Sequence, residues 1–211
     1  MKVTIIGAGS MGRGIGTRVV AGGNEVELID HDPEDARALA DELNAHGEGM
    51  ANVAETSAIT GDIVVLALPY AAVDEALGDF GEQLAGKIVV DITNPVDPSA
   101  GDRLATPAEN SAAEEIAKSL PEARVVKAFN TTFAGTLVAG RVDGEPLDVF
   151  IAGDDEEAKR QVATIVKDGG LRPIDVGPLH RARQLEHLGL LHITLQDPLG
   201  ANYGSAVKLV W

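Results

Sequence analysis

Cysteine is absent from this chain of 211 residues, and aromatic residues make up only 3% of it. The lack of cysteine excludes thiol catalysis, disulfide bonds and cysteine-ligated metals. Basic residues are also scarce, since 17 Lys and Arg stand against 33 Asp and Glu for a formal net charge of −16. A chain this acidic is a poor candidate for binding nucleic acid or an anionic membrane, because both require clustered cations.

Long hydrophobic runs are missing too. The longest apolar stretch, residues 63–69, is much shorter than the roughly 18 residues of a membrane-spanning helix. The N-terminus leads straight into a strand and a glycine pattern, without the apolar core of a signal peptide. We therefore expect a soluble, cytoplasmic protein. Because the acidic residues are spread along the whole chain, we attribute the net charge to a halophilic surface rather than to a local field.

Short β-branched runs alternate with helical segments along a chain that is 45% hydrophobic. The expected strands cover residues 3–6, 25–29, 63–68, 87–91, 125–128, 147–152 and 173–176. The expected helices cover residues 11–21, 33–45, 71–77, 112–119 and 155–167, the last with Asp154 as its N-cap. This alternation predicts right-handed βαβ units and an α/β fold with a doubly wound parallel sheet of the Rossmann type.

A glycine motif, Gly-Ala-Gly-Ser-Met-Gly at residues 7–12, directly follows the first expected strand and opens the first expected helix. In this setting Gly7 allows a tight turn, Gly9 allows a pyrophosphate to approach the backbone, and Gly12 allows close packing of helix on strand. The free N–H groups at the start of the helix favour an anion. We expect a dinucleotide to bind here, with Ser10 and Met11 among its contacts.

The second expected strand leads into Asp30, which lies 18 residues after Gly12. A carboxylate at this spacing accepts hydrogen bonds from the adenosine ribose of NAD and repels the 2′-phosphate of NADP. His31 is the nearest group that would contact a phosphate, but acidic residues flank it on both sides. The cofactor is therefore NAD or NADP, and Asp30 favours NAD.

Another strand end carries Leu68, Pro69 and Tyr70. The proline stops the strand at its carboxyl end, where ligands bind in sheets of this kind. We expect these three residues to line the pocket, with Tyr70 beside the nicotinamide half of the cofactor.

Two later strand ends bring amide groups to the same edge of the sheet. Asn94, followed by Pro95, is able to bond a carboxamide or a ribose, and Asn130 is a candidate for substrate contact. Lys127 is a second candidate, with an ion pair to one of the many acidic residues as the equal alternative. The resulting site prediction takes in Asn94, Pro95 and Asn130.

After Gly177 the chain changes character. We expect residues 1–176 to form the dinucleotide-binding domain and residues 177–211 a small helical extension that completes its pocket without being an independent domain. The extension carries a leucine stripe that suits one face of a helix, either docked on the domain or packed across a homodimer. The stripe consists of Leu185, Leu188, Leu191 and Leu195.

No metal site is expected from the histidines. His180, His187 and His192 are spaced seven and five apart, not at the i, i+4 spacing that places two ligands on one helix face. His187 or His192 is a possible proton donor to a carbonyl substrate, although surface or core roles suit both better. The chain also lacks a Gly-x-Ser-x-Gly elbow and a Walker loop, which disfavours hydrolases and NTPases.

Together these segments resemble the F420-dependent NADP oxidoreductase family. The resemblance is carried by residues 7–12, 68–69, 91–95, 127–130, 152–155 and 170–179. It implies hydride transfer between a nicotinamide and the deazaflavin coenzyme F420, with two planar rings held in parallel and no obligatory catalytic acid or base. Related domains in metalloreductases pass hydride to flavin, so a flavin acceptor is also open.

The chain departs from the NADP-using members of this family at Asp30 and His31, where those members have a small hydroxyl residue and an arginine. Two other functions remain open. One is a short relative of the 3-hydroxyacyl-CoA and β-hydroxyacid dehydrogenases, although too few residues follow Gly177 for their helical second domain. The other is a non-catalytic redox sensor that binds NAD(P)H.

Overall fold

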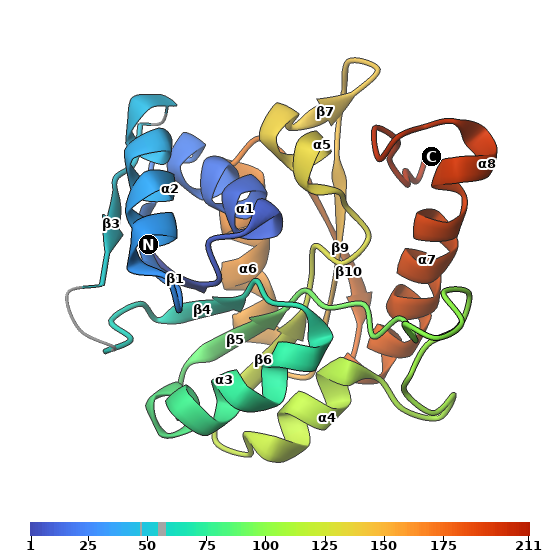
Figure 1. Ribbon diagram of the computed structural model, residues 1–211, viewed down its shortest axis with the longest axis horizontal. Coiled ribbons are helices and arrows are strands. Elements are labelled where there is room, and N and C mark those ends of the chain that lie inside the picture. Colours follow the sequence, from blue (N-terminus) through green and yellow to red (C-terminus); the bar gives the residue numbers. More distant parts are fainter. Residues whose placement is uncertain (47, 55–57) are drawn as a thin grey trace.

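The computed structural model describes residues 1–46, 48–54 and 58–211, and a long sheet runs through its centre (Figure 1). The strands of this sheet are β1 (Lys2–Ile6), β2 (Glu25–Ile29), β3 (Ala51–Val53), β4 (Ile63–Leu66), β5 (Ile88–Asp91), β6 (Arg124–Lys127), β9 (Asp148–Gly153) and β10 (Arg172–Gly177). A separate small hairpin consists of β7 (Arg141–Val142) and β8 (Glu145–Pro146).

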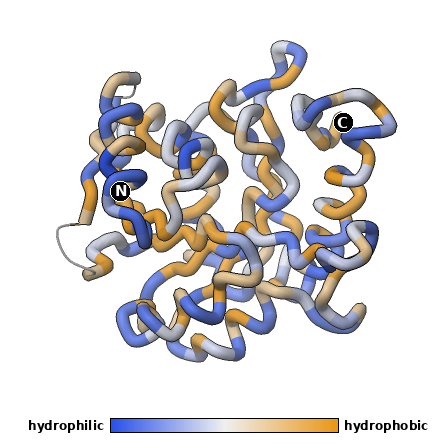
Figure 2. Tube along the Cα trace, viewed as in Figure 1, coloured by the Kyte–Doolittle hydropathy of each residue, from blue (hydrophilic) through white to orange (hydrophobic). Residues whose placement is uncertain are grey.

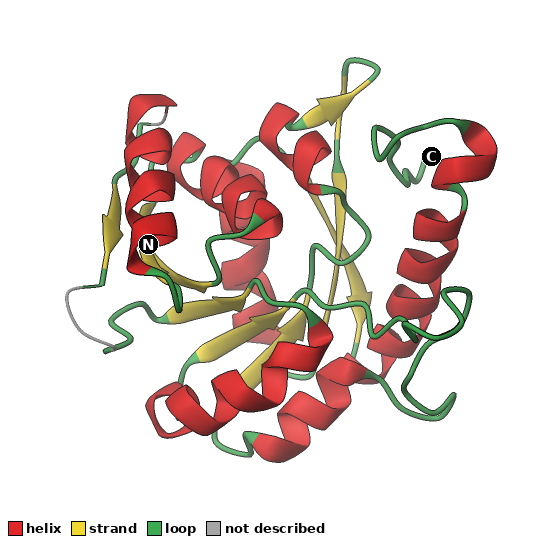
Figure 3. Ribbon diagram, viewed as in Figure 1, coloured by secondary structure: helices red, strands yellow, loops and turns green. Residues whose placement is uncertain are grey.

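Helices surround the sheet (Figure 3). They are α1 (Ser10–Ala21), α2 (Pro33–His46), α3 (Val73–Phe80), α4 (Ala112–Ser119), α5 (Ala134–Ala139), α6 (Glu156–Asp168), α7 (Ala182–Thr194) and α8 (Gln196–Leu199). Short 3-10 turns precede or follow several of them, at η1 (Tyr70–Ala72), η2 (Gly81–Leu84) and η3 (Leu179–Arg181). In the described part of the chain, no helix combines the length and apolarity needed to cross a bilayer.

The strand order is β10-β9-β6-β5-β4-β1-β2-β3, and the first six strands of the chain in this sheet run parallel. The winding reverses between β1 and β4, and a sheet wound in this way binds ligands at the carboxyl ends of its strands beside that reversal. The predicted doubly wound α/β fold of Rossmann type is therefore confirmed. The short strand β3 was not predicted.

Strand β9 runs antiparallel to β6, so the expectation of a fully parallel sheet is wrong at this edge. Only two residue pairs join the strands, Val126 with Gly153 and Lys127 with Ala152. The rest of β9 therefore extends beyond the carboxyl end of β6, accompanied by β10, which pairs with β9 in parallel. The sequence could not show this direction because an apolar run has the same appearance in either orientation.

Both faces of the sheet are covered, and the central strands are largely hydrophobic (Figure 2). On one face Val3 and Ile5 pack with residues of α1, α2 and α6. On the other face Ile6 packs with residues of α3, α4 and η3. Because successive side chains of a strand point to opposite faces, covering both faces requires apolar residues at successive positions.

The start of α6 differs from the prediction by one residue. Asp155, not Asp154, is the N-cap, and its carboxylate accepts from the N–H of Ala158. Asp154 instead accepts from the N–H of Leu179 at 2.9 Å, which ties the start of η3 to the end of β9. Two successive acidic residues offered the same capping chemistry, and the tertiary contact selects between them.

The leucine stripe after Gly177 divides between two environments. Leu185 is buried and Leu188 packs against the cluster formed with β9 and β10. Leu191 and Leu195 are 54% and 39% exposed. The first half of the stripe thus docks α7 on the sheet, whereas the second half faces outward.

Candidate functional site

The glycine motif forms the turn between β1 and α1, and its glycines have different roles. Gly7 has a φ of 110°, and a Cβ there would lie 2.4 Å from the carbonyl oxygen of Ala67. A Cβ at Gly12 would lie 2.0 Å from the carbonyl oxygen of Gly7. At Gly9, by contrast, a Cβ would meet nothing within 4 Å. Packing of the chain therefore requires Gly7 and Gly12, whereas Gly9 faces open space.

The first turn of α1 is suited to an anion. Its N–H groups have no partner within the helix, and the N-cap residue Gly9 makes no side-chain capping bond. No acidic residue lies in this turn. The helix dipole and the free N–H groups at Ser10 and Met11 together favour a phosphate here.

The carboxylate of Asp30 lies against the glycine motif. It accepts from the N–H of Ala8 at 2.6 Å and from the N–H of Asp32 at 3.0 Å, and His31 Nδ1 lies 2.7 Å away. Its side chain is only 9% exposed, whereas that of His31 is 94% exposed. Asp30 thus joins the end of β2 to the turn after β1.

Asp30 lines a cavity of about 670 Å³, called here the Asp30 cavity. Its wall also includes the acidic side chains of Glu75 and Asp79, both from α3. It contains no Lys or Arg among the described residues, and His31 is its one basic side chain. The full lining is Ile6, Gly7, Ile29, Asp30, His31, Pro33, Leu68, Ala72, Glu75, Ala76, Asp79 and Phe80.

A second hollow of about 470 Å³, called here the Asn94 cavity, lies at the carboxyl ends of β1, β4, β5 and β6. Leu68 lines both cavities. The full lining is Gly9, Ser10, Met11, Ala67, Leu68, Pro69, Tyr70, Ile92, Thr93, Asn94, Asn130, Thr132, Phe133, Ile193 and Tyr203. A slightly larger hollow of about 690 Å³ between α3 and the end of α4 contains none of the predicted site residues.

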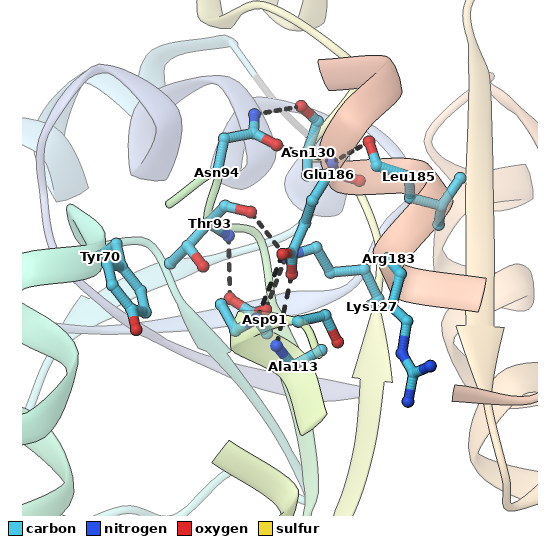
Figure 4. Close-up of polar contacts among 12 residues, drawn as sticks. Tyr70, Asp91, Thr93, Asn94, Ala113, Lys127, Asn130, Arg183, Leu185 and Glu186 are labelled. Atoms are coloured by element: carbon cyan, nitrogen blue, oxygen red, sulfur yellow. Dashed lines mark hydrogen bonds and ion pairs between the residues drawn. The ribbon is translucent and has the colours of Figure 1, made fainter. Parts of the chain in front are cut away.

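Asn94 and Asn130 form a reciprocal amide pair (Figure 4). Asn94 Nδ2 donates to the carbonyl oxygen of Asn130 at 2.7 Å, and Asn130 Nδ2 donates to Asn94 Oδ1 at 2.8 Å. Asn130 Oδ1 and the hydroxyl of Thr93 are buried without a hydrogen-bond partner. Buried polar atoms are usually paired, so these two atoms, on residues that line the cavity, have unused hydrogen-bonding capacity.

Lys127 is fully buried and does not reach the Asn94 cavity. Its Nζ lies 2.7 Å from Asp91 Oδ2 and 2.8 Å from Glu186 Oε1, and it donates to the carbonyl oxygen of Thr93 at 2.6 Å (Figure 4). The proposed substrate contact by Lys127 is therefore wrong, and the ion-pair alternative is correct. The sequence around Lys127 in β6 is apolar and did not indicate which acidic residues would pair with it.

Glu186 links this buried charge cluster to another helix. Its carboxylate also accepts from the N–H groups of Ala112 and Ala113, at 3.2 and 3.4 Å, in the first turn of α4. Burial raises the pKa of Glu186, while the Lys127 ammonium opposes that rise. One lysine between two carboxylates leaves a negative charge, which the positive end of the α4 dipole helps to stabilise.

Tyr70 lines the Asn94 cavity with its hydroxyl already engaged. The hydroxyl donates to Glu115 Oε2 at 2.6 Å. Burial and the neighbouring Glu115 carboxylate both raise the pKa of Tyr70 well above its usual range. The phenol therefore stays protonated at neutral pH and gives the cavity an aromatic wall.

Seven residues that line the Asn94 cavity were not among the predicted site residues: Ala67, Ile92, Thr93, Thr132, Phe133, Ile193 and Tyr203. The Tyr203 ring meets Phe133 edge-on at 5.2 Å, and the Phe133 ring packs on His192 at 4.3 Å. His192 is buried, which lowers its pKa, and its Nδ1 donates to the carbonyl oxygen of Thr131. The position of Phe133 shortly after Asn130 was a usable signal, whereas no pattern in the sequence pointed to Tyr203.

The predicted site residues converge on these two cavities, with two exceptions. Gly12 is packed beneath the turn, and Pro95 is buried with its carbonyl oxygen accepting from the N–H of Ala105. Among the residues that the structure describes, no cluster of three or more His, Asp and Glu side chains is arranged to hold a metal.

The doubly wound sheet, the glycine turn and the two cavities that meet at Leu68 are typical of an NAD(P)-dependent oxidoreductase, and the comparisons with known proteins show that class. A family model described as NADP oxidoreductase, coenzyme F420-dependent, matches residues 2–95. The F420-dependent NADP reductase of Methanocaldococcus jannaschii is 31% identical over 208 residues, covering 92% of each chain. The chain belongs to the F420-dependent NADP oxidoreductase family.

Other similarities agree with this family. The crystal structure of a candidate F420-dependent NADP reductase from Arthrobacter sp. FB24 has a TM-score of 0.85 and 34% identity, covering 100% of both chains. The metalloreductase STEAP3 of Rattus norvegicus is 34% identical over 190 residues, covering 90% of this chain and 36% of that protein. This chain thus spans about a third of the metalloreductase.

For the alternative of a β-hydroxyacid dehydrogenase, the similarity is one of fold alone. A 3-hydroxyisobutyrate dehydrogenase of Mycobacterium tuberculosis has a TM-score of 0.66 at 15% identity, and this chain covers 62% of it. Identity at that level supports a common fold and not a common substrate.

Proposed function

We propose that this chain transfers hydride between a nicotinamide dinucleotide and the deazaflavin F420. The observation that carries the proposal is the placement of the two cavities along the glycine turn: Gly7 lines the Asp30 cavity, Gly9, Ser10 and Met11 line the Asn94 cavity, and Leu68 lines both. This arrangement suits an adenosine, a pyrophosphate and a nicotinamide in that order. We place the acceptor ring in the Asn94 cavity beside the nicotinamide, and we take F420 as the acceptor because relatives are named F420-dependent NADP reductases.

The residues fit such a ligand in three respects. Open space at Gly9 allows a pyrophosphate to reach the backbone, and the first turn of α1 presents free N–H groups to it. The side-chain amides of Asn94 and Asn130, which line the Asn94 cavity, are the chemistry that a carboxamide would pair with. Tyr70, Phe133 and Tyr203 offer aromatic surface to planar rings.

When bound, the reduced nicotinamide supplies a hydride to the acceptor ring, which also takes a proton from solvent. The chain's own contribution is placement: holding two rings in contact converts an encounter of two molecules into a reaction within one complex. Apolar walls such as Ile92 and Ile193 exclude water from the contact. We further propose that residues 177–211 complete this pocket, since Ile193 and Tyr203 come from that extension.

To test the acceptor, the purified protein is mixed with NADH or NADPH together with one acceptor, which is F420, FMN or FAD, each in a separate reaction. We expect F420 to lose its visible absorbance at a rate at least about tenfold above that of either flavin, a difference of ~1.4 kcal/mol in activation free energy. Reduction of flavin alone would overturn F420 as acceptor in favour of flavin. No reduction of any acceptor, combined with tight NADH binding, would support the redox-sensor alternative.

We also propose that this chain prefers NADH, unlike relatives whose names specify NADP. Three acidic side chains, Asp30, Glu75 and Asp79, line the cavity that would receive the adenosine ribose, without a Lys or Arg among its described lining residues. A 2′-phosphate there would meet like charges with no guanidinium to pair with.

The double substitution Asp30→Ser with His31→Arg is expected to shift the ratio of NADPH to NADH affinity by about 100-fold toward NADPH, or ~2.8 kcal/mol. It removes one repelling carboxylate and adds a phosphate-binding guanidinium. Calorimetric titration with both cofactors measures the ratio. Asp35→Arg is the matched control, because it changes the net charge equally from an exposed position on α2 outside the cavity. An equal shift in both variants would contradict a local role for Asp30.

A further inference from the structure

One face of α7 lies against the carboxyl ends of β5 and β6. This face, called here the docking face, consists of Leu185, Glu186 and Gly189. It contacts Asn94 and Asn130, which line the Asn94 cavity; Figure 4 shows both side chains beside Leu185 and Glu186.

Each residue of the docking face makes a different kind of contact. The carbonyl oxygen of Leu185 accepts from Asn130 Nδ2 at 2.8 Å. Glu186 pairs with buried Lys127. At Gly189 the contact is steric, because a Cβ there would lie 2.4 Å from Asn94 Oδ1.

These contacts end on the cavity wall. Asn94 and Asn130 line it directly. Lys127 does not line the cavity itself, but its ammonium donates to the carbonyl oxygen of Thr93, which does. The position of α7 is therefore coupled to Asn94 and Asn130, whose amide groups line the cavity.

The buried charges permit little sliding of α7. Lys127, Asp91 and the Glu186 side chain are all fully buried, so any shift that separates the ammonium from a carboxylate leaves a charge without its partner. A helix free to adjust would accept a small side chain at Gly189 by moving away. Held by Glu186, α7 lacks that freedom.

Gly189 is accordingly not a neutral helix position. It lies in the middle of α7, where alanine has the higher helix propensity. Gly78 in α3 provides the contrast, because a Cβ there would meet nothing within 4 Å. Propensity alone thus predicts that alanine stabilises the protein at both positions. The contact with Asn94 instead predicts that alanine is unfavourable at Gly189 and remains favourable at Gly78.

We propose that Gly189 and Glu186 are positioning residues that fix the Asn94–Asn130 amide pair for the nicotinamide end of the dinucleotide. This inference rests on the proposed function in placing the nicotinamide in the Asn94 cavity. Gly189 acts by letting Asn94 approach α7, and Glu186 acts by holding the helix at that distance.

The test compares binding of NADH with binding of ADP-ribose, which lacks the nicotinamide, by calorimetric titration. Gly189→Ala is expected to weaken NADH binding about tenfold and to leave ADP-ribose binding within about twofold of the wild type. Gly78→Ala, the matched control, is expected to change neither. Equal weakening of both ligands by Gly189→Ala, or no weakening of either, would overturn the proposal.

A double-mutant cycle with Asn94→Ala shows whether Gly189 acts through Asn94. In the Asn94→Ala background, Gly189→Ala should change NADH binding less than twofold, because the clashing amide is gone. A full tenfold loss in that background would contradict the proposal. Where Gly189→Ala alone does not fold, recovery of folding in the double variant is the expected result, and failure to recover would count against it.

These measurements need no electron acceptor. Absence of turnover with every acceptor would therefore contradict the proposed hydride transfer while the NADH and ADP-ribose comparison still decides the role of Gly189.

Discussion

Replacing Lys127 with methionine is expected to lower the free energy of unfolding by about 3–5 kcal/mol, the usual cost of leaving buried charges without their partner. The ammonium is the shared partner of Asp91 and Glu186, whose side chains are fully buried. Methionine keeps much of the lysine stem but removes the charge. Urea-induced unfolding of both proteins, with equal slopes checked, measures the difference.

The effect should depend on pH. Burial raises the pKa of Glu186, and a carboxyl whose folded pKa is raised contributes stability at low pH that is lost as the pH rises through that value. Without Lys127 the pKa should rise further. The difference in free energy of unfolding between the wild type and the Lys127→Met variant is therefore expected to shrink as the pH falls from about 8 toward about 5.

Lys159→Met is the matched control. Lys159 is also buried, but its partners Glu156 and Asp175 are 70% and 53% exposed. Water can solvate those carboxylates when the lysine is lost, so the expected cost is at most about 1 kcal/mol. Equal losses in the two variants would contradict the role assigned to the buried cluster.

Substituting Gly9 with alanine is expected to raise the dissociation constant for NADH about 100-fold, or ~2.8 kcal/mol, with little change in the unfolding midpoint. The backbone of Gly9 is extended, with φ −72° and ψ −170°, which alanine adopts readily. Its Cβ would enter the space in which we place the pyrophosphate. Titration calorimetry and thermal unfolding measure the two quantities separately.

Gly12→Ala should behave differently, because its Cβ would overlap the carbonyl oxygen of Gly7 within the protein itself. We expect that variant to lose stability as well as binding. If Gly9→Ala instead unfolds at lower temperature and binds NADH normally, the turn does not receive the pyrophosphate.

The sequence was most informative where local chemistry determines structure. The glycine motif predicted both a turn and a helix start, because only glycine fits at Gly7 and Gly12. Strand ends marked by Pro69 and Asn94 predicted residues at one edge, since parallel strands end together. These signals sufficed for the parallel strands through β6 other than β3, and for the polar residues at the strand ends that line the two cavities.

What escaped prediction depends on contacts between distant segments. The direction of β9, the acids that meet Lys127 and the choice between Asp154 and Asp155 as N-cap are each decided by a partner far along the chain. Tyr203 reaches the Asn94 cavity from a segment without periodicity. Such contacts leave no pattern in a single sequence, because hydrophobic periodicity reports burial and not partners.

The short antiparallel junction between β6 and β9 is the point at which the parallel part of the sheet ends. Main-chain pairing across it is limited to two residue pairs, whereas buried side-chain contacts such as that of Lys127 with Glu186 also connect α7 to β6. The family model, which matches residues 2–95, falls entirely before this junction. Residues 148–211 nevertheless contribute Ile193 and Tyr203 to the Asn94 cavity, so a substitution there alters that cavity without touching the glycine turn.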